Sequence, residues 1–125
     1  MTPLIAEELT LELEDSPVRI RVRWLGRSNS RDPGKLLRPW FDALLEEAGR
    51  SHRPVEMQFG RLEHFNSSTI SALIQLINHA RDRRVRLSLV YDKNLKWQAL
   101  SFDALKRALR PFDDGEASPV TIVPG

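Results

Sequence analysis

The side chains with the clearest potential for chemistry form one cluster of amide and hydroxyl groups, Asn66-Ser67-Ser68-Thr69. Asn, Ser and Thr favour helix starts because their side-chain oxygens accept hydrogen bonds from the free N–H groups of the first turn. A helix start also carries partial positive charge and unpaired donors, so it accommodates an anion such as a phosphate. The cluster is therefore either a helix cap or the site of a phosphorylation switch.

Other patterns that carry catalysis or metal binding are missing from the sequence. The histidines, His52, His64 and His79, are not spaced as metal-ligand pairs, and the scattered glycines form no phosphate-binding loop. Ser67 and Ser68 lack the GxSxG frame of a nucleophilic serine. The absence of cysteine excludes disulfides and thiolate metal sites. We therefore expect a protein that is not an enzyme and that uses no metal or cofactor.

The composition is typical of one globular domain, residues 1–125, with 41% hydrophobic residues to form a core. A net charge of +2 and interspersed charges do not favour nucleic-acid binding. The basic run 81–86 falls at an expected helix end, where cations suit the helix dipole. No run approaches the roughly 20 apolar residues of a membrane span, and the N-terminus does not resemble a signal peptide. We expect a cytoplasmic protein that binds neither membranes nor nucleic acids.

Apolar residues that alternate with polar ones predict strands. The first two, with arginines facing glutamates, are expected to form a hairpin with cross-strand ion pairs. Val90 interrupts the alternation of the fourth strand and indicates that both of its faces are covered. The expected strands are residues 9–13, 18–24, 55–59, 85–91 and 120–123.

Apolar residues at helical spacing predict three helices between these strands. Asp32 and Pro33 suit the start of the first helix, Pro39 is expected to begin its regular part, and Gly49 to end it. Residues 111–118 are expected to be a flexible polar connection. The expected buried positions are Leu36, Leu37, Trp40, Phe41, Leu44, Leu45 and Ala48 in the first helix, Ile70, Leu73, Ile74 and Ile77 in the second, and Trp97, Leu100, Leu105, Ala108 and Leu109 in the third.

The resulting order, β-β-α-β-α-β-α-β, predicts an α/β fold with a mixed sheet. The opening strands have one polar face, so the helices should pack mainly on one face of the sheet. Trp24 and Trp40 lie in phase with core positions. Trp97 does not, and is either a core residue or an aromatic anchor for a partner.

The segment His64-Phe65-Asn66-Ser67-Ser68-Thr69-Ile70 resembles the phosphorylation motif of the STAS domain family, the anti-sigma factor antagonists. Their usual motif is an aromatic or apolar residue, one variable residue and Asp-Ser-Ser-Gly-Leu, at the same strand-to-helix junction. The expected element order is also similar to that fold from residue 9 to 123. The resemblance implies a STAS-like domain that binds a serine kinase acting as an anti-sigma factor. Phosphorylation of a motif hydroxyl releases that partner, and a phosphatase restores binding.

The motif departs from the family pattern at two positions. Asn66 replaces Asp, and Thr69 replaces Gly, which we expect to add bulk where a partner approaches. In addition, no helix is expected after the last strand, where family members usually have one. Binding of the partner is expected to involve His64, Asn66, Ser67, Ser68 and Thr69.

An Asn-Ser/Thr-Ser motif after an aromatic residue is also similar to that of a sister family of small bacterial phospho-regulators. Alignment with the STAS motif implies phosphorylation of Ser68, whereas alignment with the sister motif implies Ser67. We expect Asn66 to cap the helix and the phosphorylated serine to be exposed in its first turn. Some members of the sister family act on diguanylate cyclases. The alternative function is therefore a STAS-like scaffold, or a regulator of a signalling enzyme such as a diguanylate cyclase, without sigma-factor control.

Overall fold

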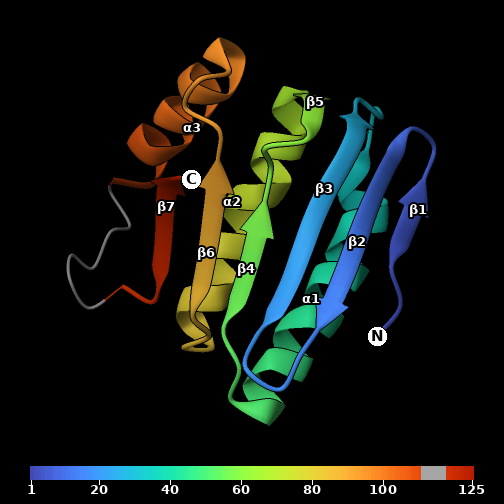
Figure 1. Cartoon of the computed structure of the whole chain (residues 1–125), viewed down its shortest axis with the longest axis vertical. Helices are drawn as coiled ribbons and strands as arrows, with labels where there is room; N and C mark the ends of the chain where they lie inside the picture. The colour runs from blue at the N-terminus through green and yellow to red at the C-terminus, as the bar shows by residue number, and fades with distance from the viewer. Residues whose placement is uncertain (111–117) are drawn as a thin grey trace.

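A computed structural model describes residues 1–110 and 118–125 of the chain (Figure 1). Its elements confirm the α/β class and the alternation of strands with helices. The predicted connection at 111–118 lies, except for Ser118, outside the described residues. The elements are β1 (Leu4–Ala6), β2 (Leu9–Asp15), β3 (Ile20–Ser28), α1 (Pro33–Ser51), β4 (Val55–Gln58), β5 (Leu62–Phe65), α2 (Ser67–Asp82), β6 (Leu87–Tyr91), α3 (Lys96–Leu109) and β7 (Val120–Pro124).

The strands form one mixed sheet in the order β1-β2-β3-β4-β6-β7, with β5 also paired to β3. β2 runs antiparallel to β1 and β3, and the remaining pairs are parallel. β3 is long enough to pair with β4 through Ile20–Arg23 and with β5 through Gly26–Ser28. The carboxyl ends of β3, β5, β6 and β7 consequently meet at one edge of the sheet, the upper edge in Figure 1.

The helices cover one face of this sheet, as predicted. The ring of Trp24 on β3 lies 6.1 Å from that of Phe41 on α1. The ring of Phe59, which follows β4, lies 4.9 Å from both Trp24 and Phe102 of α3. Leu73 and Ile77 of α2 are fully buried in the same cluster. One continuous core thus joins all three helices to the sheet.

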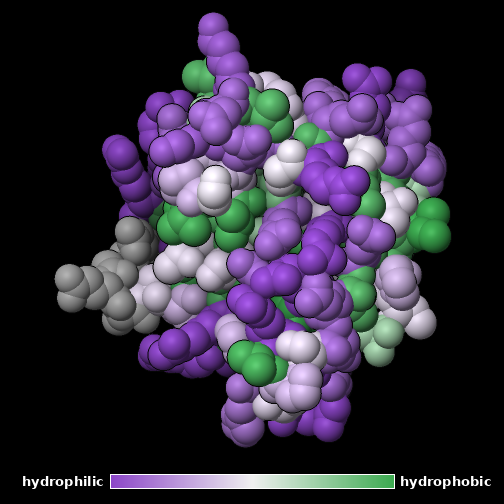
Figure 2. Space-filling model, viewed as in Figure 1, coloured by the Kyte–Doolittle hydropathy of each residue, from purple (hydrophilic) through white to green (hydrophobic). Residues whose placement is uncertain are grey.

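The opposite face of the sheet is open and largely hydrophilic, as Figure 2 shows over the middle strands. Arg23 donates to Glu14 across β2 and β3 at 2.8 Å, and Arg21 donates to Glu56 of β4 at 2.7 Å. The hydrogen bond from Arg23 lowers the pKa of the Glu14 carboxyl, and the bond to Glu56 raises the pKa of Arg21. The predicted pairing of glutamates with arginines is therefore confirmed.

The strand predictions need three corrections. The short strands β1 and β5 were not predicted, because β1 has three residues and β5 does not alternate: its two middle residues are both exposed. Val18 is not an inward strand residue, since it is 73% exposed in a turn where Ser16 accepts from its N–H. Val90 is only half-buried because the second face of β6 is open.

The predicted start of α1 is confirmed, with Asp32 at the N-cap position and Pro33 in the first turn, although the Asp32 side chain makes no capping hydrogen bond. The roles predicted for Pro39 and Gly49 are wrong. The helix begins at Pro33 and continues through Pro39 to Ser51, so Pro39 does not begin it and Gly49 does not end it. Pro39 and the residue four positions earlier, Lys35, are both exposed, so water can reach the carbonyl that loses its N–H partner. The helix ends at His52, whose left-handed φ of 55° turns the chain.

The buried faces of the helices differ in part from the predicted ones. Leu36 is 46% exposed. In α2, Ile70 and Ile74 are only half-buried, because the core-facing stripe is centred on Leu73 and Ile77. In α3, Leu100 is 61% exposed and Ala108 is also exposed. The buried positions that sequence periodicity missed are Thr69, Ala72, Leu76 and Ala80 in α2, and Gln98 and Phe102 in α3.

Candidate functional site

The Asn66-Ser67-Ser68-Thr69 cluster lies where β5 passes into α2, at the carboxyl-end edge of the sheet. Asn66 is the N-cap and has extended backbone angles, φ −94° and ψ 176°. Its Oδ1 atom accepts the backbone N–H of Thr69 at 2.9 Å. The predicted cap is therefore present, and it is Asn66 rather than a serine that provides it.

The Asn66 side chain and backbone also hold the loop that follows β3. Its Nδ2 donates to the carbonyl of Ser30 at 2.8 Å, and its backbone N–H donates to the carbonyl of Ser28 at 3.0 Å. One residue therefore fixes the start of α2 relative to the end of β3.

Thr69 completes this connection from inside the protein. Its side chain is fully buried, and its hydroxyl lies 2.7 Å from the Ser28 hydroxyl and 2.8 Å from Asn66 Oδ1. The prediction that Thr69 adds bulk to a partner-facing surface is wrong, because the third residue of the helix faces the core beneath the end of β3. We call Ser28, Ser30, Asn66 and Thr69 the junction network.

Sequence reasoning missed Ser28 and Ser30. Ser28 is the last residue of β3, and Ser30 lies in the connection between β3 and α1. The signal that identifies them is the pairing of Ser28 with Phe65 across β3 and β5. That pairing joins positions far apart in the chain, and no local pattern reveals it.

Ser67 and Ser68 have the opposite orientation to Asn66 and Thr69. Both serines are exposed in the first turn of α2, as predicted. Within residues 1–110 and 118–125, neither hydroxyl makes a hydrogen bond. The first-turn N–H groups lack helical partners and carry partial positive charge, so a negative group on either serine is electrostatically favoured. The arrangement offers two accessible hydroxyls on a preformed anion-tolerant surface.

His64 and Trp97 form the neighbouring surface. His64 is exposed on β5, and its ring lies 6.4 Å from that of Trp97. Trp97 is half-buried and packs edge-on against Phe65 at 5.4 Å. Trp97 therefore packs against the core while part of it remains exposed, and its role as an anchor for a partner stays a prediction.

Gln98 positions β5 from below. This fully buried side chain donates to the carbonyls of Phe59 at 2.5 Å and Leu62 at 3.2 Å. Its oxygen accepts the N–H of Asp92 at 2.8 Å. Gln98 thereby ties the β4–β5 connection to the turn before α3, and its burial costs little because each polar atom has a partner.

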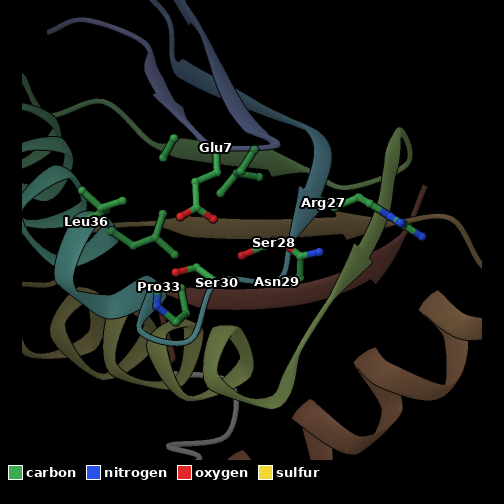
Figure 3. Close-up of a pocket in the computed structure, with 10 residues that line it drawn as sticks. Glu7, Arg27, Ser28, Asn29, Ser30, Pro33 and Leu36 are labelled. Atoms are coloured by element: carbon green, nitrogen blue, oxygen red, sulfur yellow. The ribbon is translucent and has the colours of Figure 1, made fainter.

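The junction network adjoins a cavity of about 20 Å³ behind the β3–α1 loop. Figure 3 shows Glu7 and Ser30 facing this space, whereas Arg27 points away from it. Its volume suffices for about one water, which needs ~10–15 Å³, and not for a substrate or cofactor. His64 does not line this cavity.

Metal ligands and membrane-spanning helices also bear on function. In the part of the chain that the structure describes, no three acidic or histidine side chains lie together as metal ligands. Nor does α1, α2 or α3 combine the length and apolarity needed to cross a membrane.

Comparison of the chain with models of protein families gave no match, and comparison with curated proteins gave none either. A function for the chain therefore rests on the geometry of the junction and on the resemblance of its motif.

Proposed function

We propose that the protein is a regulator similar to the anti-sigma factor antagonists, switched by reversible phosphorylation at Ser68 or Ser67. In this function it binds a serine kinase that is also an anti-sigma factor, and a phosphatase restores the binding form. It acts in the cytoplasm, where the kinase has ATP, and has no catalytic activity of its own. The observation that carries the proposal is that both serines are exposed while Asn66 alone caps the helix. A kinase can therefore modify them without opening the fold.

The switch is electrostatic. A phosphoserine adds about −1.5 to −2 charges. The start of α2 tolerates this charge, so the fold persists while the surface presented to the partner gains negative charge. That surface comprises His64, Ser67, Ser68 and the edge of Asn66. Thr69 supports it from below through its bonds to Ser28 and Asn66.

A second candidate function is a STAS-like scaffold, or a regulator of a signalling enzyme such as a diguanylate cyclase, without sigma-factor control. The observation that favours it is that Asn66 and Thr69 both serve the junction network. These are the two positions at which the motif departs from the family pattern. In this function the cluster is a structural cap, and phosphorylation is not required.

Mass spectrometry separates the two functions. The purified chain is incubated with its cognate serine kinase and ATP and then analysed as intact protein and as peptides. The proposed switch gives one phosphoryl group, on Ser68 or Ser67, and the matching Ser→Ala variant loses it. If all three hydroxyls of the cluster stay unmodified, both in this assay and in protein from its native cells, the scaffold function replaces the switch.

A further inference from the structure

A groove of about 210 Å³ separates the first turns of α1 and α2. Arg31 and Arg38 line it from the α1 side, and Ser68 and Ser71 line it from the α2 side. Asp32 is the acidic side chain in its wall. Ser67 is not part of this wall, although it is as exposed as Ser68. The two serines that the sequence left as alternatives therefore face different surroundings.

The arginines of the groove are not engaged by acids. In the described ranges 1–110 and 118–125, no carboxylate forms an ion pair with Arg31 or Arg38, whereas Arg21, Arg23 and Arg53 all have acidic partners. A guanidinium group suits a phosphate because its planar N–H donors match two phosphate oxygens at once.

Gly34 leaves room for one of these arginines. A methyl group added at Gly34 would lie 3.2 Å from Nε of Arg38 and 3.5 Å from its Cζ. The Arg38 side chain thus folds back over the first turn of α1, the direction that helical side chains favour. Arg38 therefore lines the groove while it remains exposed to solvent.

We infer that this groove receives the phosphate of phosphorylated Ser68, with Arg31 and Arg38 donating hydrogen bonds to it within the same chain. The inference rests on the proposed function, deepens it, and assigns Ser68 rather than Ser67 as the phosphoacceptor. Phosphorylation then links α1 to α2 through the phosphate and occupies both arginines. The negative charge of Asp32 repels the phosphate and reduces the stabilisation that the two arginines provide.

The test uses full-length protein in which phosphoserine is incorporated at position 68 during synthesis, so that no kinase is needed. Phosphorus NMR across a pH titration measures the second pKa of the phosphate, which is about 6 for a free phosphoserine. We expect it to be lower by about half a unit or more, because nearby cations favour the dianion. Arg31→Gln combined with Arg38→Gln should raise the pKa back towards the ordinary value, leaving only the smaller lowering that the start of α2 provides. Asp32→Asn should lower the pKa further.

The matched control is Arg61→Gln combined with Arg107→Gln, which removes the same charge from exposed positions that do not line the groove. This control should keep the lowered pKa. Circular dichroism verifies that each variant is folded, which is expected because all four arginines are exposed. An identical phosphate pKa in the two double variants would overturn the inference. So would an equal, Arg31- and Arg38-dependent lowering for phosphoserine at position 67.

Failure of the groove is distinguishable from failure of the proposed function. If a kinase modifies Ser68 but the phosphate pKa does not depend on Arg31 and Arg38, the inference about the groove is contradicted and the proposed switch is retained. If the phosphate pKa of the synthetic phosphoprotein is lowered by the two arginines but the kinase does not modify the chain, the proposed switch is contradicted. The groove would then remain as an anion site.

Discussion

Asn66 and Thr69 use their side chains inside the fold, whereas Ser67 and Ser68, which lie between them, expose theirs. All four residues are polar, small and consecutive, and all four favour a helix start or its first turn. Their positions around the first turn decide which of them is structural. The comparison teaches that the cap and the proposed switch are compatible, because different residues would provide them.

Asn66 and Thr69, the inner pair, give a physical reason for the two differences between this motif and the STAS motif that it resembles. An Asp at position 66 would accept from the Thr69 N–H as Asn66 does, but it has no donor for the carbonyl of Ser30, which Asn66 Nδ2 contacts at 2.8 Å. A Gly at position 69 would leave the Ser28 hydroxyl without its partner at 2.7 Å. Asn66 and Thr69 thus both provide hydrogen-bond partners for the end of β3 and the loop that follows it.

The largest expected effect comes from Thr69→Val, which keeps the shape of the side chain and removes its hydroxyl. The Ser28 hydroxyl and Asn66 Oδ1 would each lose a buried partner, and an unsatisfied buried polar group costs about 1–3 kcal/mol. Urea denaturation measures the loss in the free energy of unfolding. The double variant Ser28→Ala with Thr69→Val should recover part of it, because both halves of the bond are then absent. Full stability in Thr69→Val alone would contradict the inward role of Thr69.

A smaller effect is expected for Asn66. Asn66→Ala removes both the cap and the bond to the Ser30 carbonyl and should cost about 1–2 kcal/mol. Asn66→Asp keeps the cap and gains from the helix dipole, so it should cost less than Asn66→Ala. Thermal unfolding of the two variants beside the wild type gives the order. An Asp variant less stable than the Ala variant would show that repulsion from the Ser30 carbonyl outweighs the cap.

Periodicity predicted the elements that surround the junction because their signals are local. The alternation in β2 and β3 and the stripe in α2 each repeat over several residues, and the core then follows from them. The roles predicted for Pro39 and Gly49 in α1 were wrong because both residues lie on its exposed side, where a helix tolerates them. Gln98 was missed because a polar residue is buried only when distant carbonyls, here those of Phe59 and Leu62, are present to receive it.

The candidate site shows the same limit. The cluster was found because its four residues are consecutive, and the cap was assigned to Asn66 from residue type alone. The residues that surround the cluster come from the end of β3, the β3–α1 loop and α1, which are distant in the chain. For example, the two hydroxyls of the Ser28–Thr69 bond are 41 positions apart. The pairing of β3 with β5 brings that loop and Arg31 beside the motif, and the packing of α1 against α2 brings Arg38 there.

The smallest expected effect on stability, and the sharpest contrast with the inner pair, is Ser68→Asp. The side chain is exposed, and a negative charge in the first turn is worth about 0.3–1 kcal/mol in favour of the fold, so the melting temperature should stay the same or rise slightly. Binding to the cognate kinase, measured by calorimetry, should nevertheless weaken by at least about tenfold, or ~1.4 kcal/mol, because the carboxylate adds a negative charge to the proposed contact surface. Ser68→Ala is the matched control and should bind as the wild type does. A Ser68→Asp variant that binds normally would contradict the proposed switch. A variant that unfolds as readily as Thr69→Val would show that Ser68 has a structural role like that of Asn66 and Thr69.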